Sequence, residues 1–235
     1  MNKNYTVNRQ KTLVKNRKIN SIPGISEAFT TRRIKNKNSV KKALKIKKLH
    51  NLKQVHGNRV VAAGKRFKTG VKADAIITSE TNTPIAVKVA DCVAMIIVDP
   101  RNKAVAAVHA GWRGTAKRII VKAIKAMKKK FKSRPSEMIV SLSPAIRSCC
   151  YETGKDIYNK LKKDGDFSNI FTIRGGRVYM DLHKANKNLL LRAGLRNKNI
   201  YVNDICTFCN RKLYHSYRRD GKKAGRMYSI VQIEN

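Results

Sequence analysis

The feature that most constrains the fold is a pair of short apolar runs, residues 93–98 and 104–108, separated by an Asp-Pro turn at residues 99–103. Apolar runs divided in this way are typical of two paired strands. If the strands pair antiparallel, the start of the first lies beside the end of the second. Cys92 directly precedes the first run and His109 follows the second, so this pairing would bring a thiol and an imidazole together.

A helix is predicted directly after these strands. Apolar residues recur at helical spacing over residues 115–131, with lysines on the opposite face, and Thr115 is the expected N-cap. The turn before the helix contains Gly111, Arg113 and Gly114. A glycine-rich turn between a strand and a helix can present backbone N–H groups to an anion, so this segment is a candidate phosphate-binding element.

The rest of the chain predicts more strands than helices. Helices are expected at residues 40–49, 155–161 and 182–190, the last capped by Asp181 and ended by Gly194; strands are expected at residues 73–78, 85–90, 138–142, 177–180, 200–202 and 227–233. The strands do not alternate strictly with the helices, which favours one α+β domain with mixed sheets across residues 1–235. Residues 1–20 form a polar, basic N-terminal segment that would supply edge strands at most.

The charge balance is strongly basic, with 53 Lys and Arg against 14 Asp and Glu and a formal net charge of +39. The lysines are dispersed along the whole chain, and six Phe and one Trp are few for a base-stacking surface. We therefore expect a solvated basic exterior that binds nucleic acid only weakly and without sequence preference. No apolar run approaches the length of a membrane span, and the odd number of cysteines favours a reduced, cytoplasmic protein.

Three residues carry the main candidate chemistry: His56, Cys92 and His109, each at the edge of an apolar segment. Two imidazoles and a thiolate suit zinc (Zn²⁺), which takes three protein ligands in catalytic sites, and they also suit copper (Cu²⁺). Their separations do not match a zinc-finger pattern. From the pattern alone, two hydrogen-bonded histidines and a buried thiol are the simpler interpretation.

The other four cysteines offer weaker signals. Cys206 and Cys209 form a single CxxC pair with His215 nearby, but a fourth ligand is not evident, so two unligated structural thiols are expected. Cys149 and Cys150 could supply a nucleophile, although buried, unreactive cysteines are more common.

A set of motifs in a fixed order resembles the laccase-domain family, also called the multicopper polyphenol oxidase family or the purine nucleoside phosphorylases of the laccase-domain type. Some bacterial members are described as peptidoglycan-editing factors. The resemblance runs from about Phe29 to the C-terminus. The motifs are QVHG at residues 54–57, ADC at 90–92, HAGWRG at 109–114, PAI at 144–146 with CYE at 150–152, DL at 181–182 with AN at 185–186, CT at 206–207, and YRRDG at 217–221 with GR at 225–226.

The resemblance implies a metal held by His56, Cys92 and His109, with zinc expected and copper as the alternative. It also implies mixed sheets flanked by helices, in an α/β/β/α-like sandwich. Members of the family phosphorolyse adenosine, inosine and methylthioadenosine and deaminate adenosine, and a copper-dependent oxidation of phenols has been ascribed to them. The implied partners are a small nucleoside and phosphate; the oligomeric state stays open.

Roles for further residues follow from the chemistry that such an enzyme needs. Deamination needs a proton partner, for which Asp91 beside the ligand Cys92 is the candidate. Phosphorolysis needs cations for phosphate, and Arg32, Arg59, Arg113 and Arg218 are the candidates, with structural pairing as the alternative. Four other hypotheses stay open: a copper-dependent phenol oxidase, a peptidoglycan-editing hydrolase, a cysteine hydrolase with Cys92 as nucleophile and His109 as base, and a nucleic-acid-binding protein with a vestigial site.

The chain departs from the family pattern at three places. Ala94 stands where a proline is usual, and Ser143 stands where a glycine usually precedes Pro144. The N-terminal HGFSTR-like pattern is reduced at residues 27–32. The first two departures affect turn geometry near the metal, and the third affects the N-terminal part of the substrate pocket.

Overall fold

The two apolar runs form the central strands β8 (Val93–Asp99) and β9 (Ala104–Ala110), in a computed structural model that describes residues 3–64 and 66–235. They pair antiparallel, with Val93 opposite Ala110 and Ala94 opposite His109. Every residue of both strands is buried. Burial on both faces explains why the runs are continuously apolar rather than alternating.

Strands β8 and β9 lie in the middle of the first of two six-stranded sheets, whose order is β14-β10-β8-β9-β6-β5. Its pairing is mixed, because β14 joins β10 and β5 joins β6 in parallel while the other pairs are antiparallel. The remaining strands are β5 (Val60–Ala62), β6 (Ala75–Thr78), β10 (Ile139–Leu142) and β14 (Ile200–Val202).

The second sheet has the order β1-β2-β3-β15-β7-β4 and joins the two ends of the chain. The C-terminal strand β15 lies between β3 and β7, antiparallel to both. The strands are β1 (Tyr5–Val7), β2 (Leu13–Asn16), β3 (Ile25–Thr30), β4 (His50–Asn51), β7 (Ile85–Val89) and β15 (Met227–Ile233). As expected for the basic N-terminal segment, β1 is an edge strand. Strand β2 of the same segment is not, because it pairs with both β1 and β3, so the expectation of edge strands at most is wrong for residues 13–16. Residues 1 and 2 lie outside the described part.

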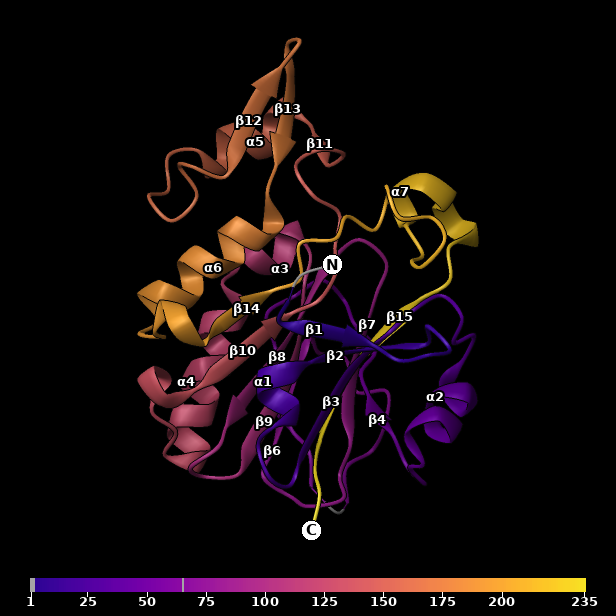
Figure 1. Ribbon diagram of the computed structural model, residues 1–235. Helices are drawn as coiled ribbons and strands as arrows, with labels where there is room; N and C mark the ends of the chain where they lie inside the picture. Colours follow the sequence, from indigo (N-terminus) through magenta and orange to yellow (C-terminus); the bar gives the residue numbers. More distant parts are fainter. Residues whose placement is uncertain (1–2, 65) are drawn as a thin grey trace.

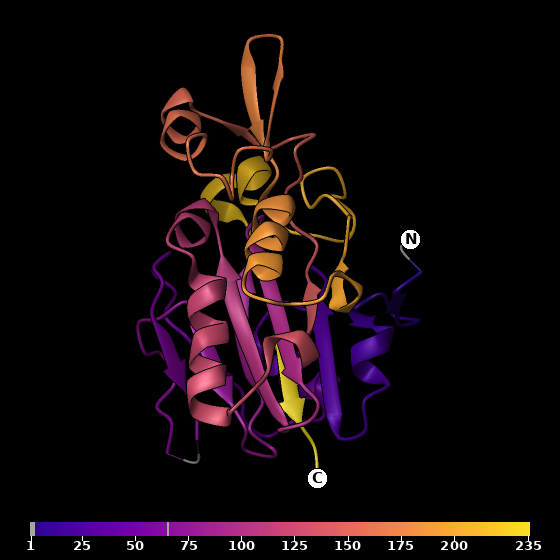
Figure 2. The same cartoon turned by 90° about the vertical axis from the view of Figure 1, so that its left-hand side faces the viewer.

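The two sheets pack face to face around one apolar core. Alternate side chains of β8, such as Ala94, Ile96 and Val98, meet residues of the second sheet such as Phe29 and Val87. The opposite side chains of β8 point to the other face of the first sheet, which helices cover. These helices are α3 (Trp112–Ala116), α4 (Ile119–Phe131) and α6 (Leu182–Arg192), and they lie along one side of the molecule (Figures 1 and 2).

Helix α2 (Lys37–Leu44) covers part of the outer face of the second sheet, where Val40 packs with Ala86 and Ile230. The layer order is therefore helix, sheet, sheet, helix, which confirms the expected α+β class and sandwich. A small third sheet, β11-β13-β12, projects from one end of the molecule beside α5 (Figure 1). The remaining elements are α1 (Arg17–Asn20), β11 (Glu152–Thr153), α5 (Lys155–Leu161), β12 (Phe171–Arg174), β13 (Arg177–Met180), α7 (Tyr217–Asp220) and the 3₁₀ turns Pro135–Glu137, Asn197–Asn199 and Gly221–Lys223.

The helix boundaries include one confirmed cap and one wrong prediction. Asp181 caps α6, accepting a hydrogen bond from the backbone N–H of Lys184 at 2.9 Å. Thr115 is not an N-cap, because it lies inside α3. The predicted single helix is also broken at Arg118, whose left-handed φ of 57° separates α3 from α4. The hydroxyl of Thr115 accepts a hydrogen bond from Asn186.

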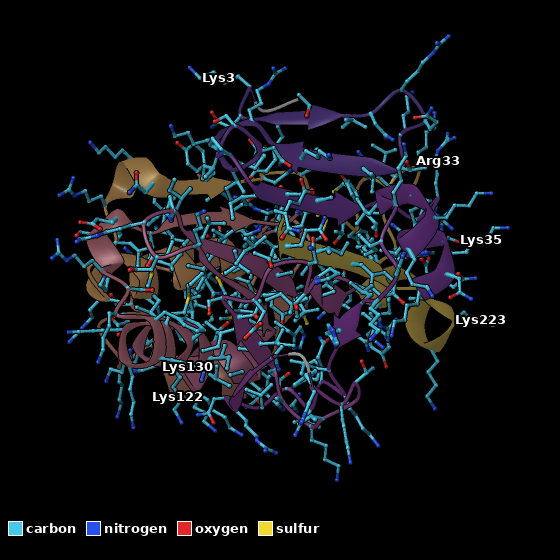
Figure 3. All side chains as sticks on the ribbon, turned by 90° about the horizontal axis from the view of Figure 1, so that it is seen from below. Lys3, Arg33, Lys35, Lys122, Lys130 and Lys223 are labelled. Atoms are coloured by element: carbon cyan, nitrogen blue, oxygen red, sulfur yellow. The ribbon has the colours of Figure 1, made fainter. Side chains whose placement is uncertain are left out.

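The basic side chains extend outward around the molecule, as the labelled Lys3, Arg33, Lys122, Lys130 and Lys223 illustrate (Figure 3). This distribution agrees with the dispersal of lysine in the sequence. Over residues 3–64 and 66–235, no helix has the length and apolarity needed to cross a membrane.

One buried acid generates a prediction about pH. Glu27 on β3 is 1% exposed, and burial raises its pKa from 4.5 to about 7, although the N–H groups of Asn16 and Asn20 lower it in part. Between pH 4.5 and 7 the unfolded chain has lost this proton while the folded chain keeps it. The contribution of Glu27 to stability is therefore full below pH 4.5 and declines by about 3 kcal/mol as the pH rises to 7.

We expect Glu27→Gln to remove this part of the pH dependence. The measurement is the free energy of unfolding in urea at pH 5 and at pH 8, with the exposed Glu234→Gln as the matched control. An unchanged pH dependence in Glu27→Gln would contradict the assignment.

Candidate active site and metal centre

The three expected ligands meet at one end of the hairpin. His109 lies on β9, Cys92 directly precedes β8, and His56 comes from the loop between β4 and β5. Their ligand atoms all lie within 4.8 Å of one another. The two imidazole rings stand edge to face, with centroids 4.7 Å apart. The antiparallel pairing predicted from the sequence therefore does bring the thiol beside the imidazole, and it adds a second imidazole.

A buried carboxylate, Asp74, holds two of these ligands in place. One oxygen lies 2.8 Å from Nδ1 of His109, and the carboxylate also accepts hydrogen bonds from the backbone N–H groups of Val55, His56 and Gly57 at 2.7–3.3 Å. His56 has a left-handed φ of 55°, which is uncommon outside glycine although histidine adopts it more often than most residues, and these hydrogen bonds stabilise it. Asp74 was missed in the sequence analysis, although it is one of few acids in a basic chain and directly precedes an apolar strand.

The same contact sets the orientation of the His109 ring. A carboxylate only accepts hydrogen bonds, so Nδ1 of His109 carries a proton and Nε2 is the atom left to face Cys92 and His56. Burial lowers the pKa of His109, but Cys92 and Asp74 outweigh it and raise the pKa to about 9. The pKa of His56 is lowered by burial and by the neighbouring His109, which favours the neutral imidazole that a metal requires.

Close packing at Gly111, the residue before α3, determines the space for the ligands. A Cβ at this position would lie 2.9 Å from the sulfur of Cys92 and 3.1 Å from Nδ1 of His56. The φ of Gly111 is −79°, which any residue adopts. The requirement for glycine is therefore steric, and it explains one residue of the HAGWRG motif.

Asp91, expected as a proton partner, is a point of attachment for the C-terminal segment. Its carboxylate accepts hydrogen bonds from the hydroxyl of Thr207 at 2.6 Å, the hydroxyl of Ser216 at 2.9 Å and the backbone N–H of Arg218 at 2.7 Å. Both oxygens are occupied. These contacts favour a positioning role, and the catalytic role of Asp91 stays a prediction.

A cavity of about 720 Å³ opens above the three ligands. Its lining combines apolar and aromatic surface with three arginines. The lining includes His56, Cys92, His109, Arg113, Arg218, Arg226, Trp112, Tyr151 and Tyr217.

The structure separates the four arginines that were expected to bind phosphate. Arg113 and Arg218 line the cavity, where they lie over the rings of Trp112 and Tyr151 respectively. Arg32 donates to the backbone carbonyl of Arg211, and Arg59 is exposed and donates to that of Lys72; neither is among the lining residues.

Arg226 lines the cavity together with Arg113 and Arg218. The sequence pattern gives Arg226 no role. The GR pair at residues 225–226, part of the family motifs, was the available signal. Tyr151 and Tyr217 were also missed as site residues, although both belong to quoted motifs.

Two departures from the family pattern lie against each other. The backbone N–H of Ala94 donates to the hydroxyl oxygen of Ser143 at 3.0 Å, and the backbone N–H of Ser143 donates to the carbonyl of Ala94 at 2.9 Å. A proline at position 94 would have no N–H, and a glycine at position 143 would have no hydroxyl to accept one. The two differences are therefore complementary.

Comparison with known proteins finds similar sequences and a similar fold. Residues 30–234 match the family described as multi-copper polyphenol oxidoreductase laccase. A purine nucleoside phosphorylase of Clostridium acetobutylicum is 36% identical over 190 residues, which cover 79% of this chain and 77% of that protein. The purine nucleoside phosphorylase YlmD of Bacillus subtilis is 33% identical over 193 residues, covering 77% and 69% respectively. The hypothetical protein YfiH of Bacillus licheniformis has the same fold, with a TM-score of 0.89, 26% identity, and coverage of 99% of this chain and 100% of that one.

The packing at Gly111 predicts the effect of adding one methyl group. If His56, Cys92 and His109 hold a metal ion, we expect Gly111→Ala to weaken its binding by about ten- to hundredfold, because the new Cβ displaces two of the ligands. Competition with a chromophoric chelator measures this affinity. Gly64→Ala is the matched control, since a Cβ at Gly64 meets no atom within 4 Å; equal affinities for the two variants would refute the steric argument.

The contact between Ala94 and Ser143 predicts a coupled pair. Ser143→Ala should lower the free energy of unfolding by about 1–3 kcal/mol, because the buried N–H of Ala94 loses its acceptor. In an Ala94→Pro background the same substitution should cost less, since no N–H is left unpaired. Urea unfolding of the four chains gives the coupling energy, and equal costs in both backgrounds would show that the hydroxyl has another role.

Proposed function

Because this chain belongs to the multi-copper polyphenol oxidoreductase laccase family, we propose that its cavity is the active site of a metal-dependent purine nucleoside phosphorylase. One observation carries the proposal. His56, Cys92 and His109 converge beneath a cavity that three arginines and three aromatic residues also line. The names of the relatives supply the reaction class, and the lining residues supply groups suited to both substrates.

The donor set fits a catalytic zinc. Two imidazoles and one thiolate are ligands that zinc prefers, and three protein ligands leave a position open to water or substrate. The hydrogen bond from His109 to Asp74 is the type of outer contact that fixes a metal-bound imidazole. A metal in this site would act as a Lewis acid and lower the pKa of bound water.

The free donors of the cavity arginines support the proposal of a phosphate site. Arg218 uses one guanidinium nitrogen on the carbonyl of Glu152, and Arg226 uses one on the carbonyls of Ala224 and Gly225. Each guanidinium has five N–H donors in all, so both retain donors for a ligand. Together with Arg113 they can offset the charge of a phosphate dianion, and the positive field of the whole chain favours its entry.

The aromatic residues are suited to a purine. Trp112, Tyr151 and Tyr217 give the cavity the large apolar surface that a planar base requires. In phosphorolysis a phosphate oxygen forms a bond to C1′ of the ribose as the bond from C1′ to N9 breaks. The electron pair leaves with the base, which takes up a proton, and the products are free base and ribose 1-phosphate.

The proposal extends to adenosine deamination, in which water replaces the amino group at C6 and ammonia leaves. A centre with three protein ligands suits this reaction class. Because both oxygens of Asp91 already accept hydrogen bonds, we propose that it positions Cys92 and the segment from Ser216 to Arg218.

We predict phosphate-dependent release of hypoxanthine from inosine by zinc-loaded protein. Chromatography of reactions with and without phosphate measures the products, and copper-loaded protein is tested in parallel on inosine and on a phenol. Equal release without phosphate would show hydrolysis. If only copper-loaded protein is active, and only on the phenol, the enzyme is an oxidase and the proposal fails.

Two arginines provide a matched comparison for the phosphate site. Arg218→Gln should raise the KM for phosphate at least tenfold, because it removes a cation that lines the cavity. Arg59→Gln is the control, since Arg59 is exposed and bonds to the carbonyl of Lys72. If both variants change the KM equally, the effect comes from the overall charge and not from the cavity.

A further inference from the structure

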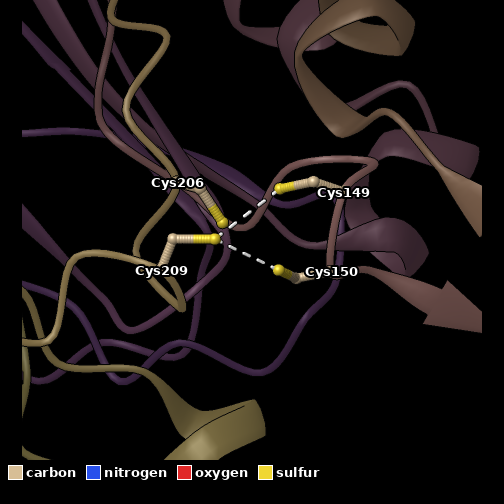
Figure 4. A group of neighbouring side chains, drawn as sticks. All are labelled: Cys149, Cys150, Cys206 and Cys209. Atoms are coloured by element: carbon tan, nitrogen blue, oxygen red, sulfur yellow. Dashed lines mark hydrogen bonds between the residues drawn. The ribbon is translucent and has the colours of Figure 1, made fainter.

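The four cysteines outside the cavity gather in one place. Cys149 and Cys150 lie in the segment between β10 and β11, and Cys206 and Cys209 follow β14. All four sulfurs lie within 4.8 Å of one another, with Cys209 at 3.3 Å from Cys150 and 3.9 Å from Cys149 (Figure 4). The CxxC pair, which has no evident partners in the sequence, therefore lies beside the two neighbouring cysteines of a distant segment.

The spacing of the sulfurs suits a tetrahedral metal. Zinc bound to four thiolates has bonds of about 2.3 Å, which places neighbouring sulfurs about 3.8 Å apart. The distances of Cys209 to Cys150 and Cys149 lie on either side of this value. All four cysteines are free thiols, so each can give up a proton to become a ligand.

The segment that carries Cys206 and Cys209 is held firmly in place. The guanidinium of Arg219 donates to the backbone carbonyls of Thr207 and Phe208, which lie between the two cysteines, at 3.1 and 2.9 Å. Only 9% of the Arg219 side chain is exposed. The charge of this guanidinium is paired with the Asp220 carboxylate at 2.8 Å, so the part of Arg219 is to fix the turn between the two cysteines.

The backbone also brings the two cysteine segments together. Ala145 and Cys206 form a parallel bridge, and the N–H of Thr207 donates to the carbonyl of Ala145 at 3.1 Å. The cluster is therefore formed by chain segments that already pair. Binding a metal there would require little rearrangement beyond the loss of the thiol protons.

We propose that Cys149, Cys150, Cys206 and Cys209 bind one zinc ion in a closed, structural site, separate from the cavity. With four protein ligands the site has no open position, as expected for a zinc that supports folding rather than catalysis. Its place explains what it would support. Tyr151, which follows Cys150, lines the cavity, and Thr207, which follows Cys206, holds Asp91. The ion would fix the segment that carries Tyr151 relative to the segment that carries Thr207.

The proposal can be tested apart from the active site, because Cys92 is the chain's one remaining cysteine. In a Cys92→Ala background, elemental analysis of protein purified under reducing conditions without chelator should find about one zinc per chain. Cobalt-substituted protein of this background should show strong thiolate-to-cobalt charge-transfer absorption. Zinc content near zero, with no zinc uptake on titration, would overturn the proposal.

Variants in the same background locate the ligands. Cys206→Ser should abolish both signals. Cys149→Ser should weaken zinc binding by at least tenfold without disturbing the core, because Cys149 is exposed. Ser148→Ala, next to Cys149 but without a thiol, is the matched control and should retain the zinc. If Cys149→Ser and Ser148→Ala retain zinc equally, Cys149 is not a ligand and the four-cysteine site is wrong.

A further measurement covers the case in which Cys206→Ser does not fold. Titration of the folded Cys92→Ala protein with an organomercurial should release about one zinc as four thiols react. Non-reducing mass spectrometry of the same protein detects disulfides as a loss of two hydrogens per pair. A disulfide among these cysteines in freshly purified, reduced protein, with no zinc released, would also overturn the proposal.

Discussion

The carboxylate of Asp74 is the contact on which the site depends most. It joins the loop that carries His56 to the strand that carries His109, and no other described residue accepts hydrogen bonds from both ligand-bearing segments. The loop adopts a left-handed backbone at His56 that this anion stabilises. Without it, the hairpin would still place Cys92 beside His109, but nothing comparable would hold the second imidazole near them.

Asp91 has the corresponding role on the other side of the cavity. Through Thr207, Ser216 and the N–H of Arg218 it attaches the C-terminal segment to the start of β8. Two buried acids thus hold together parts of the chain that are far apart in sequence. Burial raises the pKa of Asp74, but the hydrogen bonds from His109 and from the backbone N–H groups of Gly57 and Val55 hold it below its usual value, so these contacts keep the carboxylate ionised.

Much of the fold could be predicted because it depends on local patterns. The continuous apolar runs of β8 and β9 and the cap of Asp181 on α6 report directly on burial and backbone geometry. The break at Arg118 could not be predicted, since the apolar spacing of residues 115–131 continues through it.

Within the site, the three ligands followed from the motifs and from the hairpin. The motifs do not include Asp74, which acts through a contact between distant segments. The cavity arginines were only partly predicted: an arginine is suited to phosphate wherever it occurs, and only the tertiary structure separates Arg113 and Arg218 from Arg32 and Arg59. The clustering of the four cysteines could not be predicted either. It depends on the parallel pairing of Ala145 with Cys206, which no sequence pattern indicates.

The hydrogen bond between Ala94 and Ser143 also bears on how this chain could have diverged from the proline and glycine of the family pattern. Gaining the serine first is the less costly route, because its hydroxyl can donate to the carbonyl of Pro144, as it does here at 3.0 Å, whether or not residue 94 has an N–H. Gaining the alanine first would create a buried donor with no acceptor. A chain with serine at position 143 can therefore satisfy its hydrogen bonds with either proline or alanine at position 94, whereas a chain with glycine at position 143 can do so only with proline.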